Sequence, residues 1–118
     1  MSPKTIEMVE VSPRDGLQNE KQPISTADKL ELIDHALSAG VRRIEVTSFV
    51  NPRAVPQMAD AEAVCAGLPV RDDVTYIGLV MNARGADRAL ATGRIDQLGA
   101  VAVATDKFAH AGSACAML

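Results

Sequence analysis

Residues 26–47, TADKLELIDHALSAGVRRIEVT, decide the fold class because a helix pattern passes directly into a strand pattern. In the first part, Ile33 and Leu37 lie four residues apart, which places both on one face of a helix. Ser25 is a good N-cap before this pattern, and Gly40 is a good helix stop after it. The sequence therefore predicts a helix between these two residues, followed at once by another element.

The second part of this stretch has the two-residue period of a strand. Ile44 and Val46 fall on one face of the predicted strand. Arg43, Glu45 and Thr47 fall on the other face. The pattern therefore predicts a strand here, and a long polar loop follows it.

Strand and helix patterns alternate along the rest of the chain. Strands are predicted over residues 6–11, 41–47, 74–80 and 98–104, and helices over residues 26–39, over residues 56–66, and from a cap at Asn82 to Gly93. This order favours parallel strands joined by right-handed crossovers, which is an α/β fold. A closed eight-stranded barrel needs about 250 residues. The 118 residues therefore form either a small open sheet or half a barrel.

Charge and composition exclude several classes of protein. The chain carries 12 basic and 15 acidic side chains, a net charge of -3, and has no basic block, so nucleic-acid binding is not expected. No apolar run approaches the roughly 20 residues that span a bilayer, and the first residues resemble neither a signal nor a transit peptide. Membrane contact is therefore not expected. Cys65 and Cys115 have no paired-motif spacing, which favours a reducing cytoplasm.

Polar side chains gather where the first two predicted strands end. Arg14, Asp15, Gln18, Asn19 and Lys21 follow the first strand, and Glu45, Thr47, Ser48 and Asn51 lie at or after the second. In parallel α/β folds the carboxyl ends of the strands form the edge at which sites are built. These residues are therefore the candidates for a functional site.

Three of these candidates have specific chemistry. Asp15 is a hard oxygen ligand suited to Mg²⁺ or Mn²⁺, and Arg14 beside it would offset negative charge on a substrate oxygen. By spacing alone, PRDG at residues 13–16 fits a simple turn at least as well. In a barrel Glu45 would point inward and need a partner such as Arg14, Arg43 or a metal. On an edge strand it would lie in water.

Other reactive side chains are expected to be structural. His35, on the first helix, and His110, near the C-terminus, do not form a metal-binding pair. Cys65 on a helix is expected to be a small buried hydrophobic residue. Lys21 is either a solvated loop charge or a phosphate contact.

Long motifs then resemble the 3-hydroxy-3-methylglutaryl-CoA lyase family. The two longest motifs are VSPRDGLQNEK at residues 11–21 and IEVTSFVNPRAVPQMADAEAV at residues 44–64. The segment YIGLVMNARGADRAL at residues 76–90 is similar to the family's third strand and helix, and residues 101–108 are similar to its fourth strand. The resemblance implies a metal-dependent (β/α)8 TIM barrel. Residues 1–108 would form about its first four β/α units, and residues 109–118 are an atypical tail.

The resemblance also implies a reaction and roles for named residues. The reaction is cleavage of 3-hydroxy-3-methylglutaryl-CoA to acetyl-CoA and acetoacetate, the last step of leucine degradation. It implies that Asp15 is a ligand of a divalent metal, Mg²⁺ or Mn²⁺, that Arg14 stabilises the enolate oxygen, and that Glu45 supports proton transfer. Substrate or CoA contacts are implied for Gln18, Lys21, Thr47 and Ser48.

The sequence departs from the family pattern in its second half. The family completes its site with a His-x-His pair, an Asn and a Gly-Cys-Pro loop, and this chain contains neither the pair nor the loop. We therefore expect little lyase activity from the chain alone, and self-association or a homo-oligomer through unpaired strand edges. The alternatives are a related hydroxyacyl-CoA lyase, a Claisen-type synthase, or a half-barrel without catalytic activity.

Overall fold

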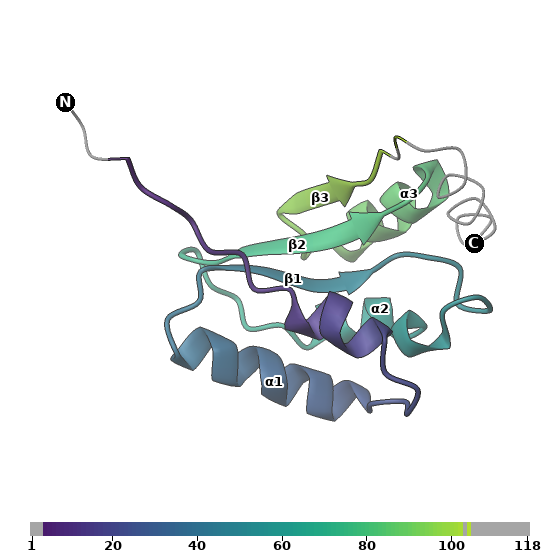
Figure 1. The fold of residues 1–118 in the computed structure, drawn as a ribbon, viewed down its shortest axis with the longest axis horizontal. Helices are drawn as coiled ribbons and strands as arrows, with labels where there is room; N and C mark the ends of the chain where they lie inside the picture. The colour runs from purple at the N-terminus through teal and green to yellow at the C-terminus, as the bar shows by residue number, and fades with distance from the viewer. Residues whose placement is uncertain (1–3, 103, 105–118) are drawn as a thin grey trace.

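The computed structural model describes residues 4–102 and residue 104. Within these residues, three parallel strands form one sheet in the order β1 (Arg43–Ser48), β2 (Thr75–Val80) and β3 (Gln97–Ala100) (Figure 1). The described helices are α1 (Thr26–Ser38), α2 (Ala61–Ala66) and α3 (Ala83–Thr92), with short helical turns η1 (Ser12–Gly16) and η2 (Pro56–Met58). Strands consecutive in the chain are neighbours in the sheet. The α/β class with parallel strands is therefore confirmed.

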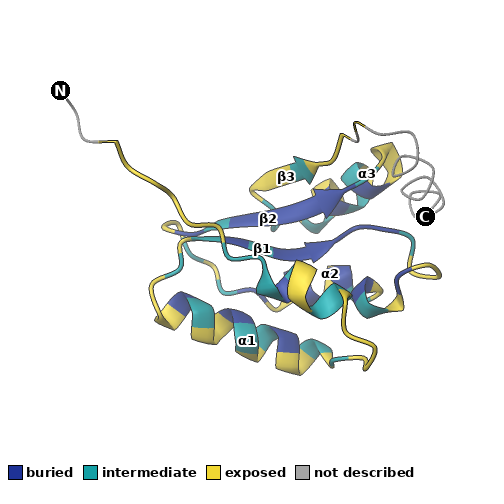
Figure 2. Cartoon of the chain, in the orientation of Figure 1, coloured by how far each residue is buried: buried dark blue, intermediate teal, exposed yellow. Residues whose placement is uncertain are grey.

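The main core lies between the sheet and the helices α1 and α2. Ile33 and Leu37 of α1 pack with Ile44 and Val46 of β1 and with Val64 of α2, and all five are buried. Figure 2 shows the strands β1 and β2 and the sheet-facing side of α1 as buried, with the outer side of α1 exposed. The apolar face predicted for the first helix is therefore the one that packs on the sheet.

Two helices begin and end where their caps predict. The Ser25 hydroxyl accepts a hydrogen bond from the Asp28 backbone N–H at 3.1 Å, and the Asn82 side chain accepts one from the Gly85 N–H at 2.8 Å. After the helices, Gly40 and Gly93 have φ angles of 105° and 66°. This left-handed region favours glycine because a side chain is strained there. Capping therefore predicted α1 and α3 well.

The strand predicted over residues 6–11 is wrong. Only Glu10 pairs with the sheet, through an isolated parallel bridge to Ile44. Earlier in the segment, Ile6 and Met8 are 88% and 80% exposed, and Figure 1 shows this part of the chain leaving the sheet. A strand at a sheet edge is stable only where its side chains are buried, and nothing among the described residues covers these two.

The helix predicted over residues 56–66 is also wrong, because it is broken into η2 and α2. At the break, the Asp60 carboxylate accepts hydrogen bonds from Thr26 Oγ1 at 2.5 Å and from Lys29 Nζ at 2.6 Å. The Lys29 ammonium is buried and also donates to the Gln57 carbonyl. These contacts fasten the break to α1, so long-range polar contacts override the local helix pattern.

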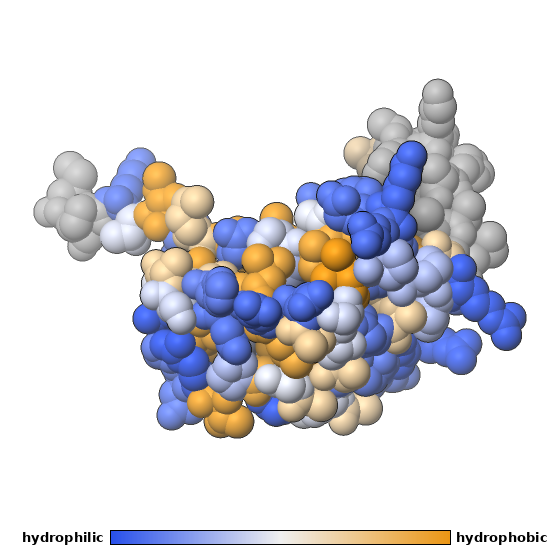
Figure 3. Space-filling view, turned by 90° about the horizontal axis from the view of Figure 1, so that it is seen from below, coloured by the Kyte–Doolittle hydropathy of each residue, from blue (hydrophilic) through white to orange (hydrophobic). Residues whose placement is uncertain are grey.

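The last predicted strand is shorter than expected, since β3 ends at Ala100 rather than at residue 104. The predicted tail, residues 109–118, and His110 lie outside the described residues. On the face shown in Figure 3, hydrophobic areas are interrupted by hydrophilic side chains. Isolated exposed apolar residues such as Val70 are ordinary on a protein surface and indicate no particular partner.

Candidate functional site

The PRDG segment forms the turn η1, and this turn directs its arginine toward the sheet. The backbone N–H groups of Arg14 and Asp15 both donate to the Val11 carbonyl, at 3.1 and 2.8 Å, and Pro13 is buried at the start of the turn. The simple-turn alternative is therefore correct as local structure. It does not compete with the site hypothesis, because the turn is what positions Arg14.

Arg14 and Glu45 form a largely buried ion pair. Arg14 Nε donates to Glu45 Oε1, and the two side chains are 19% and 13% exposed. Arg14 Nη1 also lies 3.3 Å from Asp15 Oδ1, although the Asp15 side chain is 56% exposed. The alternative in which Glu45 lies in water is wrong, and Arg14 is its partner.

The single bridge between the N-terminal segment and β1 places this pair. Glu10 N–H donates to the Arg43 carbonyl at 3.0 Å, and Glu45 N–H donates to the Glu10 carbonyl at 2.8 Å. The Glu10 carboxylate then accepts from the Ser12 N–H at 3.0 Å, at the first residue of η1. Two residues after the bridge, the chain therefore turns directly beside Glu45.

The register of β1 against β2 shifts by one residue at Val46. Glu45 opposes Ile77, whereas Thr47 opposes the next residue, Gly78. Such an extra residue is a β-bulge, which re-aims the side chains that follow it. Successive residues of β2 point to opposite faces, so the prediction that Thr47 shares a face with Glu45 is wrong.

The other residues predicted to contact the substrate do not all lie together. Ser48 is fully buried, and its hydroxyl donates to Gln18 Oε1 at 3.4 Å. The buried Thr47 hydroxyl lies 3.8 Å from the Met58 sulfur. Lys21 is exposed on the loop before α1. The structure therefore brings Gln18 and Ser48 together and leaves Lys21 in solvent.

The described residues do not make a complete metal site. Among them, no group of three or more His, Cys, Asp or Glu side chains converges so that it could hold an ion. Asp15 has an exposed carboxylate that could serve as one ligand, but its nearest charged neighbour is the cationic Arg14. A divalent ion needs about six oxygen ligands, so further ligands would have to come from elsewhere.

His35 and Cys65 match their structural predictions. His35 is exposed, with Nε2 3.8 Å from Glu31 Oε1 one helical turn away. Cys65 lies on the buried face of α2 and packs in one cluster with Phe49 and Ala89. This burial raises the pKa of its thiol to about 11. A thiol that stays protonated at neutral pH is a poor nucleophile.

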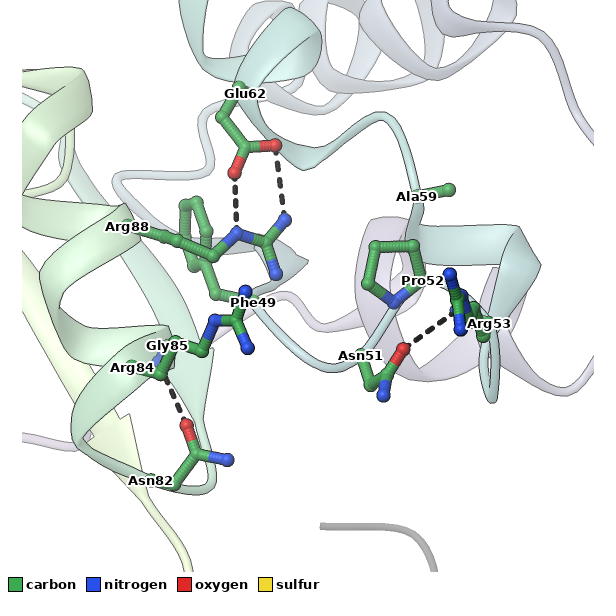
Figure 4. Close-up of a pocket in the computed structure, with 10 residues that line it drawn as sticks. All are labelled: Phe49, Asn51, Pro52, Arg53, Ala59, Glu62, Asn82, Arg84, Gly85 and Arg88. Atoms are coloured by element: carbon green, nitrogen blue, oxygen red, sulfur yellow. Dashed lines mark hydrogen bonds and ion pairs between the residues drawn. The ribbon is translucent and has the colours of Figure 1, made fainter. Parts of the chain in front are cut away.

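A second feature, which the sequence did not single out, is a cleft of about 740 Å³ beside the loop that follows β1 (Figure 4). We call it the arginine cleft. Its walls come from the loop after β1, from α2 and from the start of α3, and its lining includes Phe49, Asn51, Arg53, Glu62, Asn82, Arg84, Gly85 and Arg88. Arg53 and Arg84 each follow the end of a strand by a few residues. That position is the signal by which they could have been found.

Arg88 joins two walls of the arginine cleft. Its Nε and Nη2 atoms donate to the two oxygens of Glu62 at 2.7 and 3.1 Å, and its Nη1 donates to the Val50 carbonyl at 3.0 Å. The guanidinium also lies 5.7 Å from the centre of the Phe49 ring. The hydrogen bonds from Arg88 hold the pKa of the Glu62 carboxyl below its usual value, so this pair stays charged at neutral pH.

Comparison with known proteins gives the family. The HMGL-like family model matches residues 5–112. This chain belongs to the HMGL-like family. A curated relative from Pseudomonas aeruginosa, a 3-hydroxy-3-isohexenylglutaryl-CoA/hydroxymethylglutaryl-CoA lyase, is 46% identical over 115 residues, which are 98% of this chain and 38% of that protein.

Solved structures of the HMGL-like family agree with this fold. The crystal structure of hydroxymethylglutaryl-CoA lyase from Pseudomonas aeruginosa superposes with a TM-score of 0.86 at 46% identity, covering 97% of this chain and 38% of that one. An HMG-CoA lyase from Acinetobacter baumannii, in complex with coenzyme A and 3-methylmalate, gives 0.80 at 40% identity, over 84% and 32%.

The chain therefore spans about two-fifths of the length of these relatives. Its sheet is part of a TIM barrel, as the resemblance implied. Within residues 4–102, the structure contains no helix that is both long and apolar enough to cross a membrane.

Proposed function

We propose that this chain supplies the Arg14–Glu45 part of the active site of a carbon–carbon lyase that cleaves 3-hydroxy-3-methylglutaryl-CoA to acetyl-CoA and acetoacetate. The observation that carries the proposal is the largely buried Arg14–Glu45 pair with Asp15 beside it, in a chain of the HMGL-like family. Charges with little access to water cost free energy unless an opposite charge matches them, and Arg14 and Glu45 match each other.

The reaction needs three things from the protein. These are a base for the proton of the tertiary hydroxyl, a cation at the hydroxyl and carboxylate oxygens, and stabilisation of the thioester enolate. When the base takes the hydroxyl proton, the carbon–carbon bond breaks, the hydroxyl carbon becomes the ketone of acetoacetate, and the electron pair of the broken bond moves onto the thioester as an enolate. The enolate then takes up a proton to give acetyl-CoA. Arg14 holds Glu45 with its Nε–H group and contacts Asp15 through Nη1, and its other N–H groups stabilise negative charge on the enolate oxygen. Glu45 fixes the direction of the guanidinium and supports the proton transfer.

A divalent metal, Mg²⁺ or Mn²⁺, would supply Lewis-acid chemistry at the hydroxyl and carboxylate oxygens of the substrate. Asp15 is the ligand that this chain offers. Because the described residues form no cluster of metal ligands, we expect the 118-residue chain alone to have little lyase activity. A chelator-sensitive cleavage by the purified chain that is lost in Asp15→Asn would contradict this expectation.

The test restores the rest of the barrel. In a chimaera, this chain replaces the N-terminal part of the Pseudomonas aeruginosa relative that it matches, which is 38% of that protein. The release of acetoacetate from 3-hydroxy-3-methylglutaryl-CoA by the chimaera is then measured. The chimaera is expected to release acetoacetate, and Glu45→Gln in it is expected to remove at least about 99% of the rate. A folded chimaera that leaves this substrate intact would overturn the proposal.

One observation favours a second substrate class. The name of the Pseudomonas aeruginosa relative includes 3-hydroxy-3-isohexenylglutaryl-CoA, a thioester with a longer side chain. We propose a related hydroxyacyl-CoA as the alternative substrate, to be separated by offering the chimaera both thioesters. A cytoplasmic location, self-association and the role in leucine degradation stay predictions.

A further inference from the structure

The described lining of the arginine cleft carries more positive than negative charge, in a protein of net charge -3. Three arginines and one glutamate line it, and Arg88 and Glu62 neutralise each other. Arg53 and Arg84 are exposed, and within residues 4–102 neither side chain forms an ion pair with a carboxylate. Among the described residues, these two guanidinium groups of the cleft therefore have no carboxylate as a counter-charge.

These two arginines lie on opposite walls. Figure 4 shows Arg84 at the start of α3 and Arg53 on the loop after β1, and both residues line the cleft. The N-terminal end of α3 adds positive potential to its wall, and its first turn contains no acidic side chain. The two walls thus present positive charge toward one shared space.

The walls are also held at a fixed separation. A Cβ added to Gly85 would lie 2.5 Å from the Phe49 carbonyl oxygen, so only glycine lets α3 approach the loop this closely. The Arg88 hydrogen bond to the Val50 carbonyl, at 3.0 Å, fastens α3 to the same loop. A site with fixed walls binds its ligand with less loss of entropy than one that must order.

The chemistry of the cleft selects the class of ligand. Guanidinium forks match phosphate oxygens, to which they donate paired hydrogen bonds. A volume of about 740 Å³ accommodates an organic molecule larger than a free phosphate ion. A lining of arginine and asparagine side chains favours a charged ligand over an apolar one.

We infer that the arginine cleft binds the phosphate groups of an organic phosphate between Arg53 and Arg84. Two sources supply this chemistry: the phosphate-bearing part of an acyl-CoA substrate, or a separate phosphorylated metabolite. The first source rests on the proposed function, whereas the second does not. None of the residues of the Arg14–Glu45 site lines the cleft, so phosphate binding can be measured without any cleavage.

The test is calorimetric titration of the 118-residue chain with inorganic pyrophosphate, at low salt because salt screens exposed charges. The double variant Arg53→Gln, Arg84→Gln is expected to bind pyrophosphate at least roughly tenfold more weakly. The matched control is Arg42→Gln, Arg71→Gln, which removes the same charge from two arginines beside Asp73. Circular dichroism checks that both variants fold, and single Arg84→Gln replaces the double variant if it does not.

Arg84→Lys keeps the charge but loses the fork, so its affinity is expected between those of the parent and Arg84→Gln. An absence of pyrophosphate binding, or equal losses in the cleft and control variants, overturns the inference. Coenzyme A that competes with pyrophosphate, while pantetheine does not, assigns the site to the substrate. Pyrophosphate binding without such competition assigns it to a separate metabolite. Neither result depends on whether the chimaera cleaves its thioester.

Discussion

Two arginine–carboxylate pairs of this chain have the same chemistry and different surroundings. Arg14 and Glu45 join the N-terminal turn to the sheet, and their side chains are only 19% and 13% exposed. Arg88 and Glu62 join α3 to α2, and theirs are 25% and 48% exposed. The difference teaches that the first pair is held away from water, where losing one partner is costly, whereas the second is an accessible tie between two helices and contributes little.

The largest expected effect comes from breaking the buried pair. Glu45→Ala leaves the Arg14 guanidinium without its partner, and we expect it to lower the free energy of unfolding by about 3 kcal/mol. Urea unfolding of the 118-residue chain measures this change. A loss of less than about 0.5 kcal/mol would mean that Glu45 behaves as an exposed side chain.

The next largest effect tests how firmly α3 is held against the loop after β1, beside the Arg88–Glu62 pair. Gly85→Ala puts a Cβ 2.5 Å from the Phe49 carbonyl oxygen, so we expect a loss of about 1–3 kcal/mol in the free energy of unfolding. Gly99→Ala is the matched control, because its Cβ would make an ordinary contact at 3.7 Å. Equal stability of the two variants would show that α3 can move away from the loop.

A smaller effect is expected from the exposed pair itself. Glu62→Gln should lower the free energy of unfolding by less than about 1 kcal/mol. In the folded state, the hydrogen bonds from Arg88 hold the pKa of the Glu62 carboxyl below its ordinary value of 4.5. Its contribution is therefore complete above pH 4.5 and is lost as the pH falls through the folded pKa.

Unfolding at several pH values between neutrality and pH 3 tests this sign. The stability difference between the parent chain and Glu62→Gln should shrink as the pH falls. A difference that grows in acid would contradict the assignment.

The smallest expected effect concerns a buried group outside both pairs. Burial raises the pKa of the Cys65 thiol to about 11, so iodoacetamide at pH 8 should leave this residue unmodified in the folded chain. Mass spectrometry of the Cys65 peptide measures the labelling, and the same chain in guanidinium chloride is the positive control. Rapid labelling without denaturant would show that the site opens.

The sequence predicted local structure wherever a few neighbouring residues decide it. Caps at Ser25 and Asn82 set the starts of α1 and α3 because their bonds reach only three residues along the chain. The break before α2 was not predictable in this way. It depends on Asp60 meeting Thr26 and Lys29, which are more than 30 residues away in the sequence.

In the candidate site, too, some features could be predicted from the sequence and others required the fold. The motifs identified Arg14, Asp15 and Glu45, but the identity of the partner of Glu45 required the fold. The bulge at Val46 depends on strand register, and the assembly of the arginine cleft depends on the close approach at Gly85. Of these features, only the positions of Arg53 and Arg84 after strand ends are visible in the sequence.

The central claim is that the buried pair, and not the exposed one, takes part in the cleavage. The decisive measurement is kcat for acetoacetate release by the chimaera with Arg14→Gln or Arg88→Gln. The account predicts a loss of about a thousandfold for Arg14→Gln, since a donor to the enolate oxygen is removed, and a change within about threefold for Arg88→Gln. Equal losses in the two variants, or an unchanged kcat in Arg14→Gln, would contradict it.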